Sequence, residues 1–223
     1  MTHWLRSNRG FIVFLLCFGV FRTAVADWNP IPSGSMRPNL LEGDVVLVNR
    51  LAYDLKLPLT DVVLAQLGEP QRSDIVTFSS PADGTRMIKR IIGLPGDRIE
   101  MRDEVLYVND QPADYQQPEA LQEPVEIGGT RPALRLTEHT AGAPARRVQW
   151  IDGVAARNSF APVVVPPGHY LMLGDNRDNS ADSRYFGFVP RHLLIGQARR
   201  ILVSANIQGN WLPRLDRFGQ ALQ

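Results

Sequence analysis

Cysteine is nearly absent from this sequence: Cys17 is the only one in 223 residues. A single cysteine rules out an intramolecular disulfide and any metal site built from several thiolates, and we expect neither a metal nor a cofactor. The net charge is close to zero, at +1, and the aromatic residues are not interleaved with a basic run. Nucleic acid is therefore not an expected partner. Internal repeats, heptads and low-complexity segments are missing as well, which excludes repeat arrays and coiled coils and leaves one sizeable core.

Long apolar runs are also scarce, and the most informative one lies near the N-terminus. Residues 11–21 carry apolar side chains or glycine, with Arg6 and Arg9 before them and Arg22 after them. A membrane span needs about twenty apolar residues, so neighbouring residues must lengthen this run while the Arg22 side chain reaches the interface. The sequence Ala-Val-Ala at residues 24–26 would instead suit the cleavage site of a secretory signal peptide.

We predict a permanent anchor over residues 1–26, because Arg22 interrupts the apolar run just before the would-be cleavage site. The positive-inside rule then places the N-terminus in the cytoplasm and everything after Trp28 on the other side of the membrane. Membrane lipid is therefore an expected partner, whereas nothing in the sequence indicates an oligomeric state.

The rest of the chain reads as short strands separated by turns. β-branched or alternating runs are bounded by Gly, Pro, Asn and Asp at residues 45–48, 74–78, 86–92, 98–101, 105–108, 170–173 and 197–203. We predict a mainly β fold, a large antiparallel sheet system with one N-terminal membrane helix. Residues 98–108 should form a hairpin.

Two segments lack a clear strand pattern. Residues 51–69 show nothing that we can assign, and residues 111–165 are rich in Pro, Gln, Ala and Arg with weak periodicity. We take 111–165 as a surface excursion or small lobe that divides one β domain into residues 27–110 and 166–205.

The C-terminal residues 206–223 form a tail of different character. Apolar side chains fall there at helical spacing, at Trp211, Leu215, Phe218 and Leu222. This spacing predicts a helix end packed on the core, although Pro213 and Gly219 weaken the pattern. Contact with a membrane surface is the alternative.

A short stiff loop is the first candidate for chemistry. It reads Ile-Pro-Ser-Gly-Ser-Met-Arg-Pro-Asn-Leu-Leu over residues 31–41. Its prolines fix φ, and Gly34 between two serines permits a close approach that a β-carbon would block. Such a loop can hold one hydroxyl in place, and Ser35 is the candidate nucleophile. Taken alone, the stretch is better explained as a turn.

Lys89 is the second candidate. In an extended strand, Met87, Lys89 and Ile91 share one face, which favours desolvation of the amine. Burial would lower the pKa of this lysine from about 10.4 toward neutrality, and a neutral amine is a general base that can activate a nearby serine. The alternative is a lysine that snorkels to solvent or pairs with a carboxylate.

The third candidate is the polar stretch at residues 174–188. It packs charged side chains among small polar ones, namely Asp175, Arg177, Asp178, Asp182 and Arg184. Such a loop can build a network of charge-assisted hydrogen bonds. The arginines, and the lack of a glutamate at the final ligand position, argue against a calcium loop.

Together, three separated blocks resemble the type I bacterial signal peptidases, the membrane-anchored Ser-Lys leader peptidases. The blocks are residues 31–36 with Leu40, Gly43 and Asp44, then Ile-Lys-Arg-Ile-Ile-Gly-Leu-Pro-Gly-Asp at residues 88–97, and residues 174–190. The resemblance spans residue 22 to about residue 204, except 51–72 and 111–166. It implies a serine endopeptidase of the bacterial inner membrane, single-pass, with its catalytic domain on the extracytoplasmic side.

The resemblance also implies a role for each matching residue. Ser35 resembles the nucleophile and Lys89 the general base, while Ser33 resembles the oxyanion-hole side chain that works with the Ser35 backbone N–H. In such a dyad the lysine takes the serine proton and later gives it to the leaving amine.

Five further residues match supporting positions of the family. Ser180 resembles the serine that hydrogen-bonds and orients the lysine. Asp182 and Arg184 resemble an ion pair that supports the site, with Asp175 and Arg90 as nearby partners.

The family substrate is an exported preprotein with small side chains at the −1 and −3 positions before the cut. Shallow apolar pockets would exclude larger groups, and Ile31, Met36 and Ile88 are the motif residues expected to line them. Arg22 also lies where the family often has an arginine, which makes the Ala-Val-Ala sequence a coincidence or a self-cleavage site. Ser73 departs from the family, which usually has glycine before the Asp-Ile-Val strand.

Two alternatives remain from the sequence. One is a related Ser-Lys peptidase dedicated to a single substrate, such as the pilin-processing peptidases of conjugation systems. The other is a non-catalytic exported binding module, which would require the loss of Ser35 or Lys89, and both are present.

Overall fold

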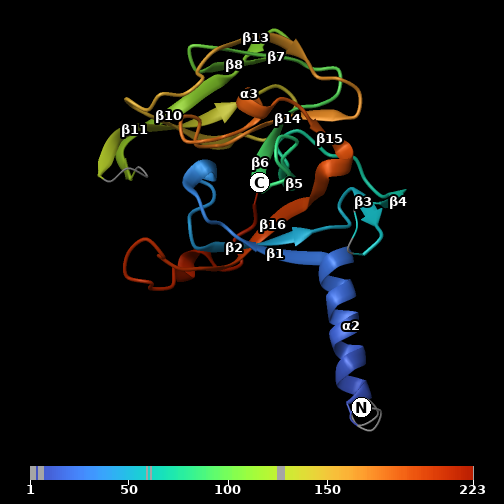
Figure 1. Cartoon of the computed structure of the whole chain (residues 1–223). Coiled ribbons are helices and arrows are strands. Elements are labelled where there is room, and N and C mark those ends of the chain that lie inside the picture. The colour runs from blue at the N-terminus through green and yellow to red at the C-terminus, as the bar shows by residue number, and fades with distance from the viewer. Residues whose placement is uncertain (1–3, 5–7, 59, 61, 125–128, 223) are drawn as a thin grey trace.

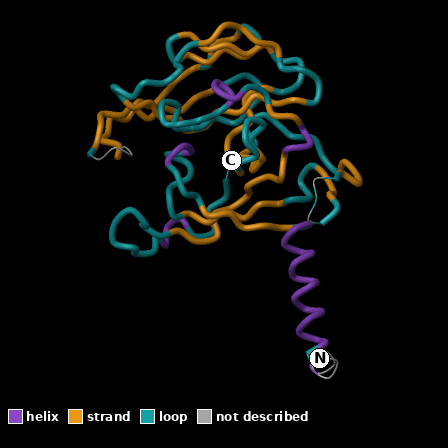
Figure 2. The backbone as a smooth tube through the Cα atoms, in the orientation of Figure 1, coloured by secondary structure: helices purple, strands orange, loops and turns teal. Residues whose placement is uncertain are grey.

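The chain folds mainly into antiparallel strands, with one long helix at its N-terminal end among the described residues (Figure 1, Figure 2). The structure is a computed structural model that describes residues 4, 8–58, 60, 62–124 and 129–222. The predicted mainly antiparallel β fold is confirmed, since every pair of neighbouring strands runs antiparallel.

The helix α2 (Arg9–Ala24) covers most of the predicted anchor; residues 1–3 and 5–7 of that anchor lie outside the described residues. It projects away from the sheets with its apolar side chains exposed (Figure 1). Within the described part of the chain, no helix has both the length and the apolar character needed to cross a membrane. At the end of α2 the Arg22 Nε lies 3.2 Å from the Asp27 carboxylate, and its guanidinium lies over the Trp28 ring. These contacts tie the helix to the first strand.

Seven strands form the main sheet, in the spatial order β1-β2-β16-β5-β6-β14-β15. Their bounds are β1 (Ala26–Pro30), β2 (Asp44–Asn49), β5 (Ile75–Ser79), β6 (Arg86–Gly93), β14 (His169–Leu173), β15 (Val189–Pro190) and β16 (Leu194–Ser204). In the register of this sheet, Lys89 lies opposite Val76 of β5, and Arg90 lies opposite Leu173 of β14. The segment that follows β14 therefore begins beside β6.

Three smaller sheets complete the fold. The strands are β7 (Arg98–Arg102), β8 (Val105–Val108), β9 (Gln111–Pro112) and β13 (Phe160–Val164) in one sheet, β10 (Asp114–Pro124), β11 (Thr130–His139) and β12 (Arg146–Ile151) in another, and the hairpin β3 (Asp54–Lys56) with β4 (Val63–Gln66). The hairpin predicted over residues 98–108 is confirmed, with Met101 opposite Leu106.

The region 111–165 thus contains an ordered three-stranded sheet and a strand, β13, that returns to pair with β7. Strand β10 has one buried residue, Glu123, along its length. A strand with little burial needs no alternation of apolar and polar side chains, which explains why its sequence showed weak periodicity.

The predicted helix at the C-terminal end is wrong. Residues 205–222, called the C-terminal tail below, form extended backbone and turns, with only a short 3₁₀ turn, η3 (Leu215–Arg217). Pro213 lacks the backbone N–H that a helix needs, and Gly219 has a positive φ of 72°, which ends a helix. Trp211 and Leu215 are each 70% exposed rather than packed on the core.

Candidate active site

Ser35 lies on a loop that is closed at its base. We call residues 31–44 the Ser35 loop. The Ile31 N–H donates to the Asp44 carbonyl at 2.8 Å, and the Gly43 N–H donates to the Ile31 carbonyl at 3.0 Å. Inside the loop a short 3₁₀ turn, η1 (Gly34–Met36), carries Ser35, and the Met36 side chain is fully buried. The loop therefore holds the Ser35 hydroxyl in a defined place.

The Lys89 amine lies against that hydroxyl. The Lys89 Nζ is 2.6 Å from the Ser35 Oγ, and it donates a second hydrogen bond to the Ile88 carbonyl at 3.0 Å. Lys89 is 3% exposed and Ser35 is 8% exposed. Two residues that are far apart in the sequence thus meet in a largely water-excluded pair.

Burial lowers the pKa of Lys89 to about 8, while the Asp182 and Asp175 carboxylates oppose this shift and the Arg184 charge adds to it. Taking an ammonium out of water disfavours its charged form, which is why burial is the dominant cause. At mildly alkaline pH a large share of Lys89 is therefore the neutral amine that a general base must be.

Ser33 lies next to Ser35 on the solvent side. Its hydroxyl donates to the Ser35 Oγ at 3.5 Å, near the upper limit for a hydrogen bond, and the residue is exposed. A hydroxyl with such a weak partner can turn toward another hydrogen-bond acceptor.

The segment after β14 packs on the Ser35 loop at a glycine. A β-carbon on Gly174 would lie 2.2 Å from the Ser180 Oγ and 2.6 Å from the Ser35 carbonyl oxygen. Both distances are below van der Waals contact, so only glycine allows the segment to approach the loop this closely.

The Asp182 carboxylate accepts several hydrogen bonds within this segment. The donors are the Ser180 Oγ at 2.8 Å, the Gly174 N–H at 3.0 Å and the Arg184 Nε at 2.8 Å. It also caps the short helix α3 (Ser183–Phe186) through the Arg184 N–H. Among the described residues, Ser180 is bonded to Asp182 and not to the Lys89 amine, so the structure brings Ser180 into the site without the contact that the resemblance implied.

Arg90 and Asp175 form a buried ion pair beside Lys89. The Arg90 Nε and Nη2 each lie 2.8 Å from one oxygen of the Asp175 carboxylate. Asn39 of the Ser35 loop donates to the same carboxylate at 2.7 Å. This pair therefore joins β6, the segment after β14 and the Ser35 loop.

Sequence reasoning missed Asn176. Its side-chain Nδ2 donates to the Gly34 carbonyl at 3.0 Å, and its backbone N–H donates to the Ser35 carbonyl at 3.1 Å. Asn176 is fully buried. It lies inside the third sequence block, but no spacing rule indicates that its amide reaches a loop so distant in the sequence.

The unusual Ser73 has a physical explanation in the structure. It adopts a positive φ of 76°, where glycine is ordinarily favoured. Its Oγ accepts a hydrogen bond from the Arg146 Nη1 at 3.0 Å, and its carbonyl accepts one from the Arg90 Nη1 at 2.8 Å. The serine hydroxyl thus links the segment before β5 to β12, which a glycine could not do.

Arg146 and Arg177 share the fully buried carboxylate of Glu138. Burial alone would raise the pKa of Glu138, but the charges of both arginines and a hydrogen bond from Tyr115 outweigh it and lower this pKa to about 2. Glu138 is therefore ionised at neutral pH and compensates the two buried guanidinium groups.

The three predicted pocket residues lie in one cluster. Ile31 and Met36 are buried, and Ile88 packs against them with part of its surface exposed. No group of three His, Cys, Asp or Glu side chains in the described ranges is placed to hold a metal ion.

Comparisons with known proteins show which family this chain resembles. The family model described as "Signal peptidase, peptidase S26" matches residues 1–203. A signal peptidase I of Buchnera aphidicola is 30% identical over 98% of this chain and 82% of its own length, and that of Pseudomonas aeruginosa is 33% identical over 95% and 77%. That of Rickettsia massiliae is 34% identical over 91% and 81%. A solved signal peptidase I from Enterococcus faecalis is 34% identical over 58% of this chain and 96% of its own, with a TM-score of 0.34.

Proposed function

The chain belongs to the signal peptidase family, peptidase S26, and we propose on that premise that Ser35 is its nucleophile and Lys89 its general base. Its activity is that of a serine peptidase that removes signal peptides. The observation that carries the residue assignment is the 2.6 Å distance between the Lys89 Nζ and the Ser35 Oγ in a buried setting.

The proposed reaction follows from this pair. Neutral Lys89 accepts the Ser35 hydroxyl proton as the Ser35 Oγ attacks the scissile carbonyl carbon, so that a C–O bond forms and the carbonyl oxygen becomes an oxyanion. The Ser33 hydroxyl and the Ser35 N–H are the donors for that charge, and one such donor typically contributes about 3–4 kcal/mol. Protonated Lys89 then gives its proton to the leaving amine, which leaves an acyl-enzyme that water hydrolyses by the same route.

We assign cleavage after small residues at the −1 and −3 positions to the cluster of Ile31, Met36 and Ile88. Ile31 and Met36 are buried in one apolar cluster on the loop that carries Ser35, and Ile88 packs against this cluster. A shallow apolar recess excludes large side chains by overlap rather than by recognising a particular group.

We assign α2 to the bacterial inner membrane, with the N-terminus in the cytoplasm and the sheets outside. The helix has 16 residues, about 24 Å at 1.5 Å per residue, against a hydrocarbon core of about 30 Å. Most of its apolar side chains that the structure describes are exposed, and Arg22 over the Trp28 ring suits the boundary with water.

Cleavage of a preprotein carrying Ala-x-Ala tests the dyad. The full chain is assayed in detergent or lipid beside Ser35→Ala and Lys89→Ala, in preparations free of host enzyme. Both variants should be inert while they remain folded. Lys56→Met is the matched control, because Lys56 is also buried but donates to the His192 and Leu194 carbonyls, away from Ser35. Cleavage by either dyad variant would refute the assignment.

A folded wild type that does not cleave this preprotein would instead indicate a peptidase dedicated to one substrate.

The membrane anchor is tested by labelling Cys17, which is exposed on α2. It should resist a water-soluble maleimide in intact membranes and react after denaturation. Sequencing of the mature N-terminus completes the test, since a first residue of Asp27 would show that the Ala-Val-Ala sequence is cut and that no anchor remains.

A further inference from the structure

The C-terminal tail follows the segment that the family model matches, and it folds back along β16. The Ile201 N–H donates to the Gln220 carbonyl at 2.9 Å, and the Gly219 N–H donates to the Ile201 carbonyl at 2.8 Å. Strand β5 pairs with β16 only as far as Gln197. The tail therefore continues the main sheet next to β16 where β5 has ended, and it leads the chain end back toward the centre of the molecule (Figure 1).

Arg217 of the tail holds the base of the Ser35 loop. Its Nε lies 3.1 Å and its Nη2 lies 2.5 Å from the two carboxylate oxygens of Asp44, which is fully buried. The same Nη2 donates to the Asn39 carbonyl at 3.0 Å. The Asp44 carboxylate in turn accepts the Leu41 N–H at 2.8 Å. One guanidinium thus bridges two points of the loop in the forked geometry that arginine favours.

Two more tail side chains reach the same loop at Glu42. The Arg214 Nη1 donates to the Glu42 carbonyl at 3.0 Å, and the Gln208 Nε2 donates to the Glu42 carboxylate at 3.0 Å. The Gln208 Oε1 accepts a hydrogen bond from Arg37 at 3.1 Å. The polar side chains of the tail therefore converge on residues 37–44.

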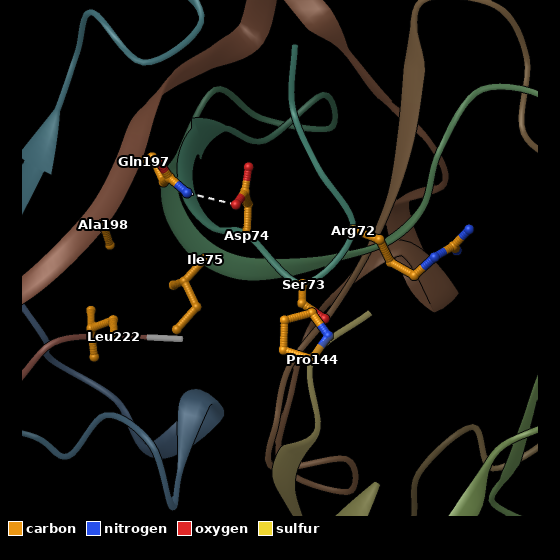
Figure 3. A pocket seen from close by; sticks show the side chains of 8 residues that line it. All are labelled: Arg72, Ser73, Asp74, Ile75, Pro144, Gln197, Ala198 and Leu222. Atoms are coloured by element: carbon orange, nitrogen blue, oxygen red, sulfur yellow. Dashed lines mark hydrogen bonds between the residues drawn. The ribbon is translucent and has the colours of Figure 1, made fainter. Parts of the chain in front are cut away.

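Leu222 adds an apolar contact at the end of the tail. It packs against the core cluster that contains Met36 and Leu40 of the Ser35 loop. It also lines a pocket of about 370 Å³ with Ile75 and Ala198, in which the Gln197 amide donates to Asp74 at 2.6 Å (Figure 3). A second pocket, of about 640 Å³, is lined by Pro38 and Asn39 of the loop and by Arg217 and Leu222 of the tail. The tail therefore meets the loop through a limited set of direct contacts beside an open pocket.

We propose that the C-terminal tail is a positioning segment that sets where the Ser35 loop stands relative to Lys89; this rests on the proposed role of Ser35 as nucleophile. Lys89 is held by the sheet, where it lies opposite Val76 of β5 and its neighbour Arg90 lies opposite Leu173 of β14. Ser35 is held by the loop, whose base is fixed by Arg217. The Lys89–Ser35 distance therefore depends on the tail, although no tail residue touches either side chain.

The size of the effect follows from the geometry of the pair. A shift of about 1 Å in a reacting group costs roughly 10- to 100-fold in rate, because the attack distance and the proton-transfer distance both lengthen. Loss of the clamp should therefore lower kcat by that range and leave KM within about twofold, since the proposed substrate pocket is not contacted by the tail arginines.

The experiment compares Arg217→Gln with Arg200→Gln in the full chain. Arg200 is an exposed arginine that donates to the Gly219 carbonyl of the tail but does not reach the loop, so it is a matched control. Folded fraction is taken from thermal unfolding, and kcat and KM are expressed per folded molecule. Hydrogen exchange of the backbone amides reports the loop independently of activity. Arg217→Gln should raise exchange at Leu40, Leu41 and Gly43 and leave β5 and β6 unchanged, whereas Arg200→Gln should change neither measurement.

The inference is overturned if Arg217→Gln has the kcat of the wild type per folded molecule and if hydrogen exchange in the Ser35 loop is unchanged. It is also overturned by a uniform rise of exchange across the sheets, which would mean that the tail only stabilises the fold. If Arg217→Gln fails to fold, Arg214→Gln decides by the same two measurements, because its contact at Glu42 is less buried. The two hypotheses can fail separately. If the proposed role of Ser35 is wrong, Ser35→Ala retains activity, whereas the hydrogen-exchange result for Arg217→Gln does not depend on that role.

Discussion

The side-chain amide of Asn176 donates to the backbone carbonyl of Gly34 at 3.0 Å, and this contact orients the peptide unit that carries the Ser35 N–H. A peptide unit is planar and trans, so its carbonyl and its N–H point in opposite directions. Because the Gly34 carbonyl points toward Asn176, the Ser35 N–H points away from Asn176. That N–H is one of the two proposed oxyanion donors, which makes Asn176 a positioning residue for transition-state charge.

The first prediction concerns this contact. Asn176→Ala should lower kcat by roughly tenfold or more and leave KM almost unchanged, a smaller loss than the 10²–10³-fold that removal of an oxyanion donor costs. Affinity for a peptide aldehyde, which forms a tetrahedral adduct, should fall in parallel, while affinity for the uncharged product-like amide should not. The control is Asn179→Ala, whose side chain makes no hydrogen bond to the Ser35 loop among the described residues. Equal weakening of both ligands would contradict the role.

The second prediction is a pH profile. Burial lowers the pKa of Lys89 to about 8, and only the neutral amine can accept the Ser35 proton. Below this pKa the amine is protonated and inactive, so kcat/KM should rise about tenfold per pH unit as pH approaches about 8 and then level off. The measurement is kcat/KM from about pH 6 to about pH 10, with the folded fraction checked at each point. A profile that is flat across this range would exclude Lys89 as the base, whereas a rise only near the ordinary lysine value of about 10.4 would show that burial does not lower its pKa.

The third prediction tests the close approach at Gly174. Gly174→Ala places a methyl group 2.2 Å from the Ser180 Oγ and 2.6 Å from the Ser35 carbonyl oxygen. The Ser35 loop must then move away from Asp182 and Lys89, and activity should fall about 100-fold, with a loss of about 1–3 kcal/mol in unfolding free energy. Gly19→Ala is the matched control, because a β-carbon there meets nothing within 4 Å. Wild-type activity in Gly174→Ala would show that the loop tolerates displacement.

The fourth prediction separates a buried ion pair from an exposed one. Arg90→Gln leaves the Asp175 carboxylate buried without its bidentate partner and should cost about 3–5 kcal/mol of unfolding free energy. Arg147→Gln removes the Arg147–Glu119 pair, in which both side chains are about half exposed, and should cost at most about 1 kcal/mol. Urea unfolding followed by tryptophan fluorescence measures both. Similar losses in the two variants would mean that burial does not determine how much each ion pair contributes to the unfolding free energy.

Much of the candidate site was accessible from the sequence. Ser35 and Lys89 were candidates from local chemistry, in a Pro-Ser-Gly-Ser loop and between apolar residues of a strand, and the resemblance of three sequence blocks to a family implied their roles. The family resemblance of these blocks is confirmed by the comparisons. The antiparallel strands and the hairpin at residues 98–108 followed from alternation and turn residues, which also act over a few neighbours. The prediction of a C-terminal helix was wrong, because Pro213 and Gly219 disfavour a helix more than four apolar residues at helical spacing favour it.

What only the tertiary structure decided is which distant segments face each other. Ser180 could be named from its block, but the fold directs its hydroxyl to Asp182 rather than to Lys89. The Asn176 amide, the Ser73 hydroxyl and the Arg217 guanidinium find their partners at Gly34, Arg146 and Asp44. Sequence spacing determines the face on which a side chain lies, whereas its partner depends on sheet order and register between residues far apart in the chain. The sequence by itself therefore determined the family of this protein and the reacting groups that we propose, and the tertiary structure decided what holds these groups in place.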